Sequence, residues 1–191
     1  MVICFLGCDG VGKSTIIDEL ISDSFSTNSV FHLKPMKNCL QNTRSDNALI
    51  IPRPKKPYGK FRSYLKILYL IIQYNLGWLI NVARSKKKLI IFDRYLNDIL
   101  VDPDRFRYSG SSKVSRFAMK LIPKPQYFFV LIADEKVILS RKQELSLSLI
   151  KKMQHKYLKL VEKSDDYFLI DANKDIGYIK EMIKNYLSEL I

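Results

Sequence analysis

The chain has 191 residues and a mass of 22.3 kDa, the size of one domain with room for a small insertion. Its hydrophobic content of 47% is enough to bury a core, and its 7 glycines and 7 prolines exclude collagen-like and low-complexity proteins. Its 32 Lys and Arg against 19 Asp and Glu give a net charge of +13, which favours an anionic partner, and its 3 cysteines favour a reducing compartment.

Strand-like and helix-like segments alternate along the whole sequence. In chain order we predict a strand at Val2–Leu6, a helix at Lys13–Ser22, a strand at Val30–Leu33, a long basic loop over about 35–59, a helix at Phe61–Arg84, a strand at Leu89–Phe92, helices at Tyr95–Val101 and Lys113–Ile122, a strand at Tyr127–Ala133, a helix at Ser148–Lys163, a strand at Tyr167–Ile170 and a helix at Asp175–Leu190. The strands are continuous apolar runs, which is typical of a parallel sheet covered by helices on both faces. We therefore predict an α/β fold with about five parallel strands, formed by residues 1–191 as one domain.

The most apolar segment, Tyr64–Val82, belongs to the long predicted helix. Polar residues interrupt it, and a membrane-spanning helix needs about 20 mostly apolar residues, so we expect a buried core helix. An interfacial membrane role is the alternative. The N-terminus has neither the basic segment nor the long apolar run of a signal peptide, so we expect a cytoplasmic protein, with peripheral attachment to the inner face of the membrane left open.

A glycine-rich motif joins the first predicted strand to the first predicted helix. Gly7-Cys8-Asp9-Gly10-Val11-Gly12-Lys13-Ser14 fits the pattern G-x-x-x-x-G-K-[ST]. Such a loop turns its backbone amides toward phosphate oxygens, while the Lys reaches the β- and γ-phosphates and the Ser hydroxyl binds Mg²⁺. The motif predicts a P-loop NTPase fold that binds a nucleoside triphosphate. The predicted binding residues are Gly7, Gly10, Val11, Gly12, Lys13, Ser14 and Thr15.

Several segments resemble one enzyme family. Phe5–Thr15 is similar to the first motif of thymidylate kinases, in which an acidic residue followed by Gly lies inside the loop. Asp93-Arg94-Tyr95, at the end of a predicted strand, resembles their Asp-Arg-Tyr motif. Pro123-Lys124-Pro125 before the next strand, and Arg141 after it, resemble their approach to the lid. Ile170-Asp171-Ala172 resembles the late strand end beside the adenine.

The resemblance implies an ATP-dependent kinase that uses Mg²⁺. Phosphoryl transfer is catalysed mainly by positioning and by neutralising negative charge, which Lys13, Arg94 and the metal would supply. By resemblance, Asp9 would hold an acceptor hydroxyl or orient Arg94, and Asp93 would act near the Mg²⁺ through water, with Ser14 as the other metal-binding residue. The alternative for Asp93 and Arg94 is a strand-end ion pair.

By resemblance, the lid would also contribute a basic residue. The loop positions Cys8–Val11 contain none, so Arg141 or Lys142 is the candidate, in a short lid over about 141–149. An exposed helix face is the alternative for both. Asp171 and Ala172 would lie beside the adenine.

The acceptor half of the family pattern is largely absent. The family's Arg-Glu-Pro-Gly-like turn is replaced by Leu33-Lys34-Pro35-Met36, and the Arg of its long helix by Ile71-Ile72-Gln73-Tyr74. A site without its base-reading hydrogen bonds loses discrimination, so we expect a rebuilt acceptor site. The segment Arg105–Gly110 could clamp a phosphate or a sugar, with a surface loop as the alternative. The candidate acceptor-binding residues are Lys34, Tyr74, Tyr95, Asp98, Arg105 and Arg107.

Three functions are compatible with these sequence features. The first is a kinase whose acceptor is a nucleoside monophosphate such as dTMP, or the hydroxyl of a sugar or glycan precursor used for cell-surface polysaccharide. The second is a non-catalytic nucleotide-binding module that docks on an anionic surface. The third is a nucleic-acid binder, which we do not expect because no nucleic-acid motif is present. The sequence is also compatible with a homodimer.

The positive charge is concentrated in one stretch. Residues 47–92 contain ten Lys and Arg and neither Asp nor Glu, which leaves +3 for the rest of the chain. The phosphate-binding motif and Arg94 lie outside this stretch, so ATP binding does not explain the excess. An acidic acceptor, or an anionic membrane surface that presents it, would explain it, and a solvated loop is the alternative.

Overall fold

The computed structural model describes residues 1–22, 29–35, 56–85, 89–141, 145–162 and 164–189. In chain order the described elements are β1 (Val2–Gly7), α1 (Lys13–Ser22), β2 (Ser29–His32), α2 (Lys60–Gly77), the π-helix η2 (Trp78–Val82), β3 (Ile90–Asp93), α3 (Asp98–Val101), α4 (Ser112–Lys120), β4 (Tyr127–Ile132), α5 (Glu135–Arg141), α6 (Leu147–Val161), β5 (Tyr167–Asp171) and α7 (Ile176–Glu189). Most of the predicted loop 35–59 lies outside the described residues.

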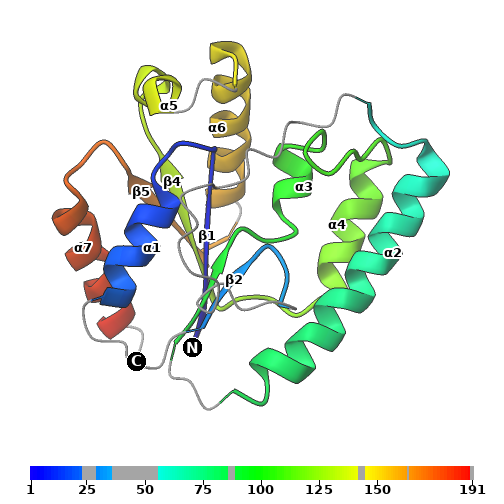
Figure 1. The fold of residues 1–191 in the computed structure, drawn as a ribbon, viewed down its shortest axis with the longest axis horizontal. Helices are drawn as coiled ribbons and strands as arrows, with labels where there is room; N and C mark the ends of the chain where they lie inside the picture. Colours follow the sequence, from blue (N-terminus) through cyan, green and yellow to red (C-terminus); the bar gives the residue numbers. More distant parts are fainter. Residues whose placement is uncertain (23–28, 36–55, 86–88, 142–144, 163, 190–191) are drawn as a thin grey trace.

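The five strands form one parallel sheet in the order β2-β3-β1-β4-β5. Figure 1 shows α1 and α7 on one face of the sheet, and α2, α3, α4 and α6 on the other. This three-layer arrangement confirms the predicted α/β fold, and it explains why β1, β3 and β4 are almost entirely buried: each strand is covered on both faces.

The register brings the carboxyl ends of the strands together at one edge of the sheet. Phe5 of β1 lies opposite Asp93 at the end of β3, and Gly7 lies opposite Leu131 of β4. Ile132 in turn lies opposite Asp171 at the end of β5. The loops that follow these strands are therefore neighbours, and ligands of parallel α/β sheets bind at this edge.

The prediction of a buried core helix is wrong for α2. Leu70 and Tyr74 face the sheet, but only 28% of the most apolar window in α2 and η2 is buried. The two together are long and apolar enough to cross a membrane, by length and composition only. The helix carries apolar residues on nearly all of its faces, but the other described residues cover only one side of it. The large apolar side chains that stay exposed on the other side are Phe61, Tyr64, Leu65, Leu68, Tyr69, Ile72, Leu76, Leu79 and Ile80.

Candidate active site

The glycine-rich motif forms a tight loop between β1 and α1. Gly7 and Gly12 have φ values of 148° and 103°, which favour glycine. A Cβ on Gly7 would also lie 2.8 Å from the carbonyl oxygen of Leu131, so this position excludes any larger residue. Cys8 is fully buried inside the loop, and Ser14 and Thr15 are exposed in the first turn of α1. The loop therefore leaves the N-terminus of α1 open to an anion.

Lys13 is folded back over this loop. Its Nζ donates hydrogen bonds of 2.9 Å to the carbonyl oxygens of Gly7 and Cys8, and the side chain is nearly buried. Burial, together with the nearby positive charge of Arg94, lowers the pKa of Lys13 from 10.5 to about 8. A buried ammonium group with two neutral acceptors is poorly compensated, so this position favours a negatively charged ligand.

We expect ATP binding to take up protons at alkaline pH. The phosphates would raise the pKa of Lys13, which is about 8 without them, so binding at pH 8.5 should take up roughly 0.7 proton and binding at pH 7 very little. Calorimetric titration with ATP in buffers of different ionisation enthalpy measures this number. In the Lys13→Met variant, the proton uptake on ATP binding should be the same at pH 8.5 and pH 7. A larger uptake at pH 8.5 that survives this substitution would show that Lys13 is not the group that takes up the proton.

Arg94 is the centre of a buried charge cluster beside the phosphate loop. Its backbone has a φ of 74°, and its amide donates to the Phe5 carbonyl oxygen at 2.9 Å. One guanidinium nitrogen pairs with Asp98 Oδ2 at 2.6 Å, and the other pairs with Asp9 Oδ1. The second oxygen of Asp9 accepts from Arg105 Nη2 at 2.5 Å. Two guanidinium groups are thus held on one carboxylate of the phosphate loop.

Tyr157 of α6 completes this cluster from a distant part of the sequence. Its hydroxyl lies 2.9 Å from Asp98 Oδ1 and 3.3 Å from the Gly7 carbonyl oxygen, and its ring is fully buried. Burial and the charge of Asp98 raise the pKa of Tyr157 well above its usual value, so it stays a neutral donor. Asp98, predicted as an acceptor-binding residue, is completely buried and fixes Arg94 instead.

The end of β3 offers a carboxylate that fits a divalent cation. Asp93 Oδ2 lies 3.0 Å from His32 Nδ1, and Oδ1 is buried without a hydrogen-bond partner. Burial opposes ionisation of Asp93, but the hydrogen bond with His32 and the charge of Lys13 outweigh it and lower the pKa of Asp93 to about 2. Among the described residues no group of three or more His, Cys, Asp or Glu could hold a metal. Mg²⁺ commonly binds through one carboxylate plus substrate phosphates, and Asp93 with the Ser14 hydroxyl fits that pattern.

Arg141, the last residue of α5, reaches back over the phosphate loop. Its Nη1 lies 3.6 Å from where a Cβ on Gly12 would stand. The predicted lid residue and the predicted phosphate loop are therefore neighbours. Residues 142–144 of the predicted lid 141–149, including Lys142, lie outside the described residues.

We expect Arg141→Gln to lower kcat by about 10²- to 10³-fold, because Arg141 would, by the family resemblance, place a cation beside the transferred phosphoryl group. The KM for ATP should change much less, and steady-state kinetics separate the two parameters. Lys136→Gln is a matched control, since Lys136 lies on the same helix and is exposed. Equal losses in the two variants would mean that Arg141 acts only through surface charge.

Comparison with known proteins identifies the family of the chain. A family model described as Thymidylate kinase matches residues 5–183. The chain belongs to the thymidylate kinase family. Members of this family are ATP-dependent nucleotide kinases, and they typically use ATP with Mg²⁺. No curated protein matches the sequence.

Solved structures show the same fold at low sequence identity. Thymidylate kinase from Candida albicans has a TM-score of 0.65 and 17% identity, and the match covers 98% of this chain and 91% of that one. Thymidylate kinase from Ehrlichia chaffeensis has a TM-score of 0.65 and 16% identity, covering 98% of both chains. Deoxyadenosine kinase from M. mycoides has a TM-score of 0.59 and 17% identity, covering 99% of this chain and all of that one.

The residues predicted to lie beside the adenine form a turn at the end of β5 in this thymidylate kinase family member. Asp171 Oδ1 accepts from the amide and the side chain of Asn173 at 3.0 and 2.9 Å, and the Ala172 amide donates to the Ile132 carbonyl oxygen at 2.7 Å. Asn173 also lines a hollow of about 280 Å³ with Ala133 and Gln154. The turn thus lies at the same edge of the sheet as the phosphate loop.

Two of the predicted acceptor-binding residues belong to the core. Tyr74 and Tyr95 are at most 1% exposed, and their rings pack edge to face with centroids 4.7 Å apart. The Tyr74 hydroxyl donates to the Leu33 carbonyl oxygen, and the Tyr95 hydroxyl to that of Pro123 at 2.6 Å. This placement corrects the prediction, because both side chains are packed inside the core.

The remaining predicted acceptor residues differ in their surroundings. Lys34 Nζ lies 5.5 Å from the centre of the exposed Tyr69 ring. Arg107 stacks on Tyr58 at 4.1 Å and donates through Nε to the Lys56 carbonyl oxygen at 2.9 Å. Only Arg105 is joined to the Arg94 cluster. Sequence reasoning missed His32 as the partner of Asp93, and it missed Tyr157, for which no local pattern gives a signal.

Proposed function

We propose that this chain transfers the γ-phosphate of ATP, with Mg²⁺, to a phosphorylated acceptor of the nucleoside monophosphate type. The main observation behind the proposal is that the guanidinium groups of Arg94 and Arg105 both pair with the Asp9 carboxylate. Arg94 is buried, whereas the side chain of Arg105 is 32% exposed beside the phosphate loop. An exposed guanidinium next to a buried one suits forked binding of a second phosphate group, which a free nucleoside would lack.

The proposed division of labour follows from the side chains. Lys13 and Arg141 bind the transferred phosphoryl group, and Arg94 neutralises charge between donor and acceptor. Asp9 keeps both guanidinium groups oriented rather than acting as a base, since both of its oxygens accept from arginine. Asp93 and Ser14 would hold Mg²⁺, whose charge would further neutralise the phosphates.

An ADP-release assay with a panel of acceptors tests the proposal. The panel contains dTMP, dUMP and dAMP, the matching free nucleosides, and sugar phosphates with the matching free sugars for the glycan-precursor alternative. We expect turnover only with phosphorylated acceptors, and an Arg105→Gln variant should raise the KM for the acceptor without changing the KM for ATP. Lys13→Met sets the background. No ADP above that background, in a protein that binds ATP, would leave a non-catalytic nucleotide-binding module.

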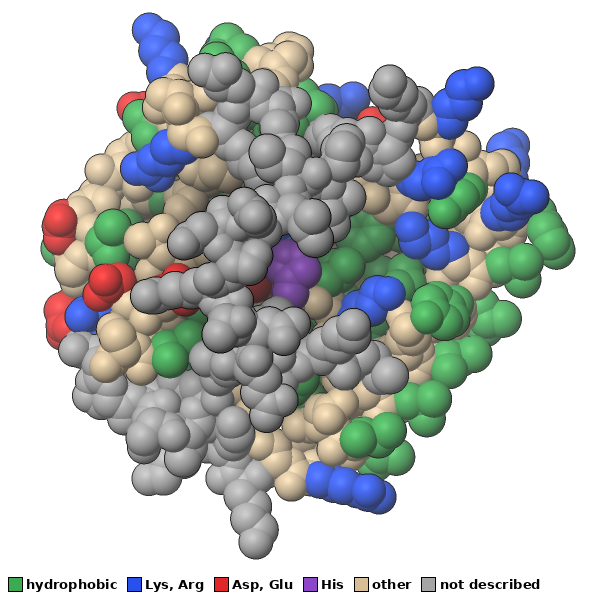
Figure 2. All heavy atoms as spheres, viewed as in Figure 1, with side chains coloured by type: hydrophobic (Ala, Val, Ile, Leu, Met, Phe, Trp, Pro, Cys, Tyr) green, Lys and Arg blue, Asp and Glu red, His purple; other side chains and the backbone are tan. Residues whose placement is uncertain are grey.

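We also propose that α2 attaches the protein to an anionic membrane surface. Figure 2 shows the apolar side chains on the right-hand side of the molecule, with Lys and Arg around them. Lys60, Arg62 and Arg84 lie exposed at the two ends of the apolar face. An apolar helix face flanked by cations is typical of interfacial membrane helices, and the charges of Lys60, Arg62 and Arg84 would make two copies of this face repel each other.

Vesicle flotation tests this attachment. The protein should float with vesicles of phosphatidylcholine and phosphatidylglycerol, and much less with phosphatidylcholine alone. Leu68→Gln with Ile72→Gln should abolish flotation, whereas Tyr178→Gln on the exposed side of α7 should not. Sedimentation velocity on the same variants covers the alternative. A dimer that the paired substitution converts to a monomer, without any flotation, would show that a second copy covers α2.

A further inference from the structure

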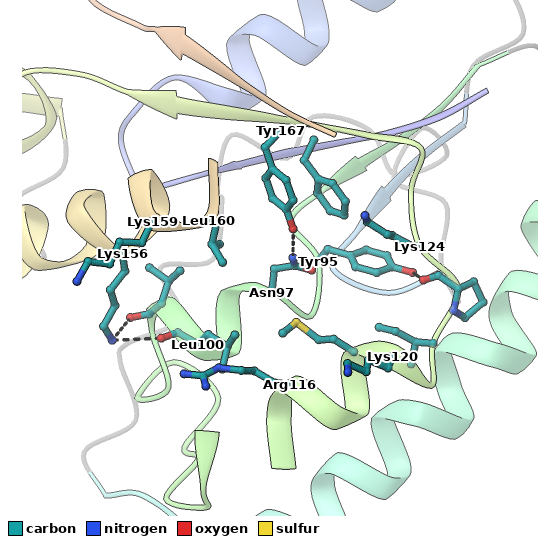
Figure 3. Close-up of a pocket in the computed structure, with 15 residues that line it drawn as sticks. Tyr95, Asn97, Leu100, Arg116, Lys120, Lys124, Lys156, Lys159, Leu160 and Tyr167 are labelled. Carbon is teal, nitrogen blue, oxygen red and sulfur yellow. Dashed lines mark hydrogen bonds between the residues drawn. The ribbon is translucent and has the colours of Figure 1, made fainter. Parts of the chain in front are cut away.

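A second cavity of about 450 Å³ lies away from the phosphate loop, between α3, α4, α6 and the first residues of β4 and β5. Figure 3 shows that α4 contributes Arg116 and Lys120 to one wall and α6 contributes Lys156 and Lys159 to the opposite wall. Its size is within the range of small-molecule sites. We propose that this cavity is a binding site for an anionic amphiphile, a compound with a phosphate or carboxylate head on an apolar body.

The floor of the cavity is aromatic. Phe128 and Tyr167 stack with ring centroids 4.6 Å apart, and the buried Tyr95 ring adjoins Phe128. The polar atoms on this floor already have partners: Asn97 Nδ2 donates to the Tyr167 hydroxyl at 2.6 Å, and the Tyr95 hydroxyl donates to the Pro123 carbonyl oxygen. The Tyr95 and Phe128 rings are themselves buried, so the accessible apolar lining comes from Tyr167 together with the partly buried Leu100, Met119 and Leu160. Such a lining suits a hydrocarbon chain or ring.

The rim is cationic, and only part of its charge has an acidic partner. Lys124 pairs with Asp166, and Lys156 donates to the Leu100 and Val101 carbonyl oxygens at 3.2 and 2.9 Å. The other three cations, Arg116, Lys120 and Lys159, have no acidic partner among the residues that the structure describes. No described Asp or Glu lines the cavity. Cations around a low-dielectric hollow focus a positive potential on it. The cavity thus combines an apolar floor with an anion-attracting rim.

The cavity is separate from the nucleotide site. In the register of the sheet, Phe128 lies opposite Cys4, whereas Gly7 of the phosphate loop lies opposite Leu131. Three residues of strand separate the two levels, a distance of about 10 Å. A ligand of this cavity would therefore bind together with ATP and would not compete with it.

Calorimetric titration of the full chain with octyl phosphate, below its micelle concentration and with saturating AMP-PNP, tests the proposal. We expect one saturable site for octyl phosphate. Inorganic phosphate and 1-octanol, which each carry half of the required chemistry, should bind at least about tenfold more weakly. A parallel titration with octyl carboxylate shows whether the site prefers a fatty acid or a phosphate ester.

Two variants locate the site. Arg116→Gln with Lys120→Gln should weaken octyl phosphate at least about tenfold, whereas Lys113→Gln with Lys151→Gln, on the same two helices, should not. Leu160→Trp should also block binding by filling the cavity, and thermal unfolding verifies that this variant folds. Equal binding of 1-octanol, competition by AMP-PNP, binding that survives both variants, or no binding at all would each overturn the proposal.

Discussion

Replacing Lys13 by Met should abolish phosphoryl transfer and stabilise the protein. The loss in kcat should be about a thousandfold or more, because the cation proposed to contact the transferred phosphate disappears. The free energy of unfolding at pH 7 should rise by about 1–3 kcal/mol, since the substitution removes a buried ammonium group whose pKa is about 8 instead of 10.5. Denaturant unfolding and an ADP-release assay on the same preparation measure both effects.

The stability gained by the Lys13→Met substitution should depend on pH. A lowered pKa means that the charge of Lys13 costs stability at every pH below 8, and that the cost fades as the pH rises from 8 to 10.5. The advantage of the Met variant should therefore be constant near neutrality and shrink over that interval. Lys151→Met, at an exposed position of α6, should show neither effect. A Met variant that is less stable than the parent at pH 7 would contradict the account of Lys13 as a poorly compensated charge.

Arg94→Gln should also lose activity, but it should destabilise the protein instead of stabilising it. Arg94 neutralises Asp98, which is completely buried, so its removal leaves an uncompensated carboxylate and should cost about 3–5 kcal/mol. For a chain of this length such a loss lowers Tm by about 6–20 °C. Thermal unfolding, together with kcat, measures the change.

A second substitution separates the two roles of Arg94. Arg94→Gln combined with Asp98→Asn removes both charges, keeps a hydrogen-bond acceptor for Tyr157, and leaves Asp9 paired with Arg105. The double variant should recover more than half of the lost stability, while kcat stays at the level of the single variant. Recovery of activity together with stability would show that Arg94 only maintains the fold and does not act on the phosphates.

The sheet and the phosphate loop could be predicted because their signals are local. Each strand is a continuous apolar run, and the loop needs glycine at fixed spacing. The pairs that organise the site are not local: His32 and Asp93 are 61 residues apart, Tyr157 and Asp98 are 59, and Arg105 and Asp9 are 96. Nothing in the sequence around Asp98 distinguishes a residue that binds an acceptor from one that holds Arg94.

The error on α2 has a different physical origin. Periodicity shows that a helix is apolar on most of its faces, but it does not show how many of those faces the sheet can cover. Tyr74 and Leu68 look equivalent in the sequence, yet Tyr74 is fully buried and Leu68 is 54% exposed. A single helix against one face of a sheet buries one side only, and the periodicity does not show what lies against the other side.

The buried thiol in the phosphate loop bears on how this protein tolerates oxidants. Burial raises the pKa of Cys8 to about 12, although Lys13 and Arg94 lie near enough to lower it. At physiological pH almost none of this thiol is thiolate, the form that reacts with peroxide and with alkylating agents. A cysteine one residue after the first glycine of the loop thus serves as an inert packing group, and nucleotide binding should persist in oxidising conditions that inactivate enzymes with exposed thiolates.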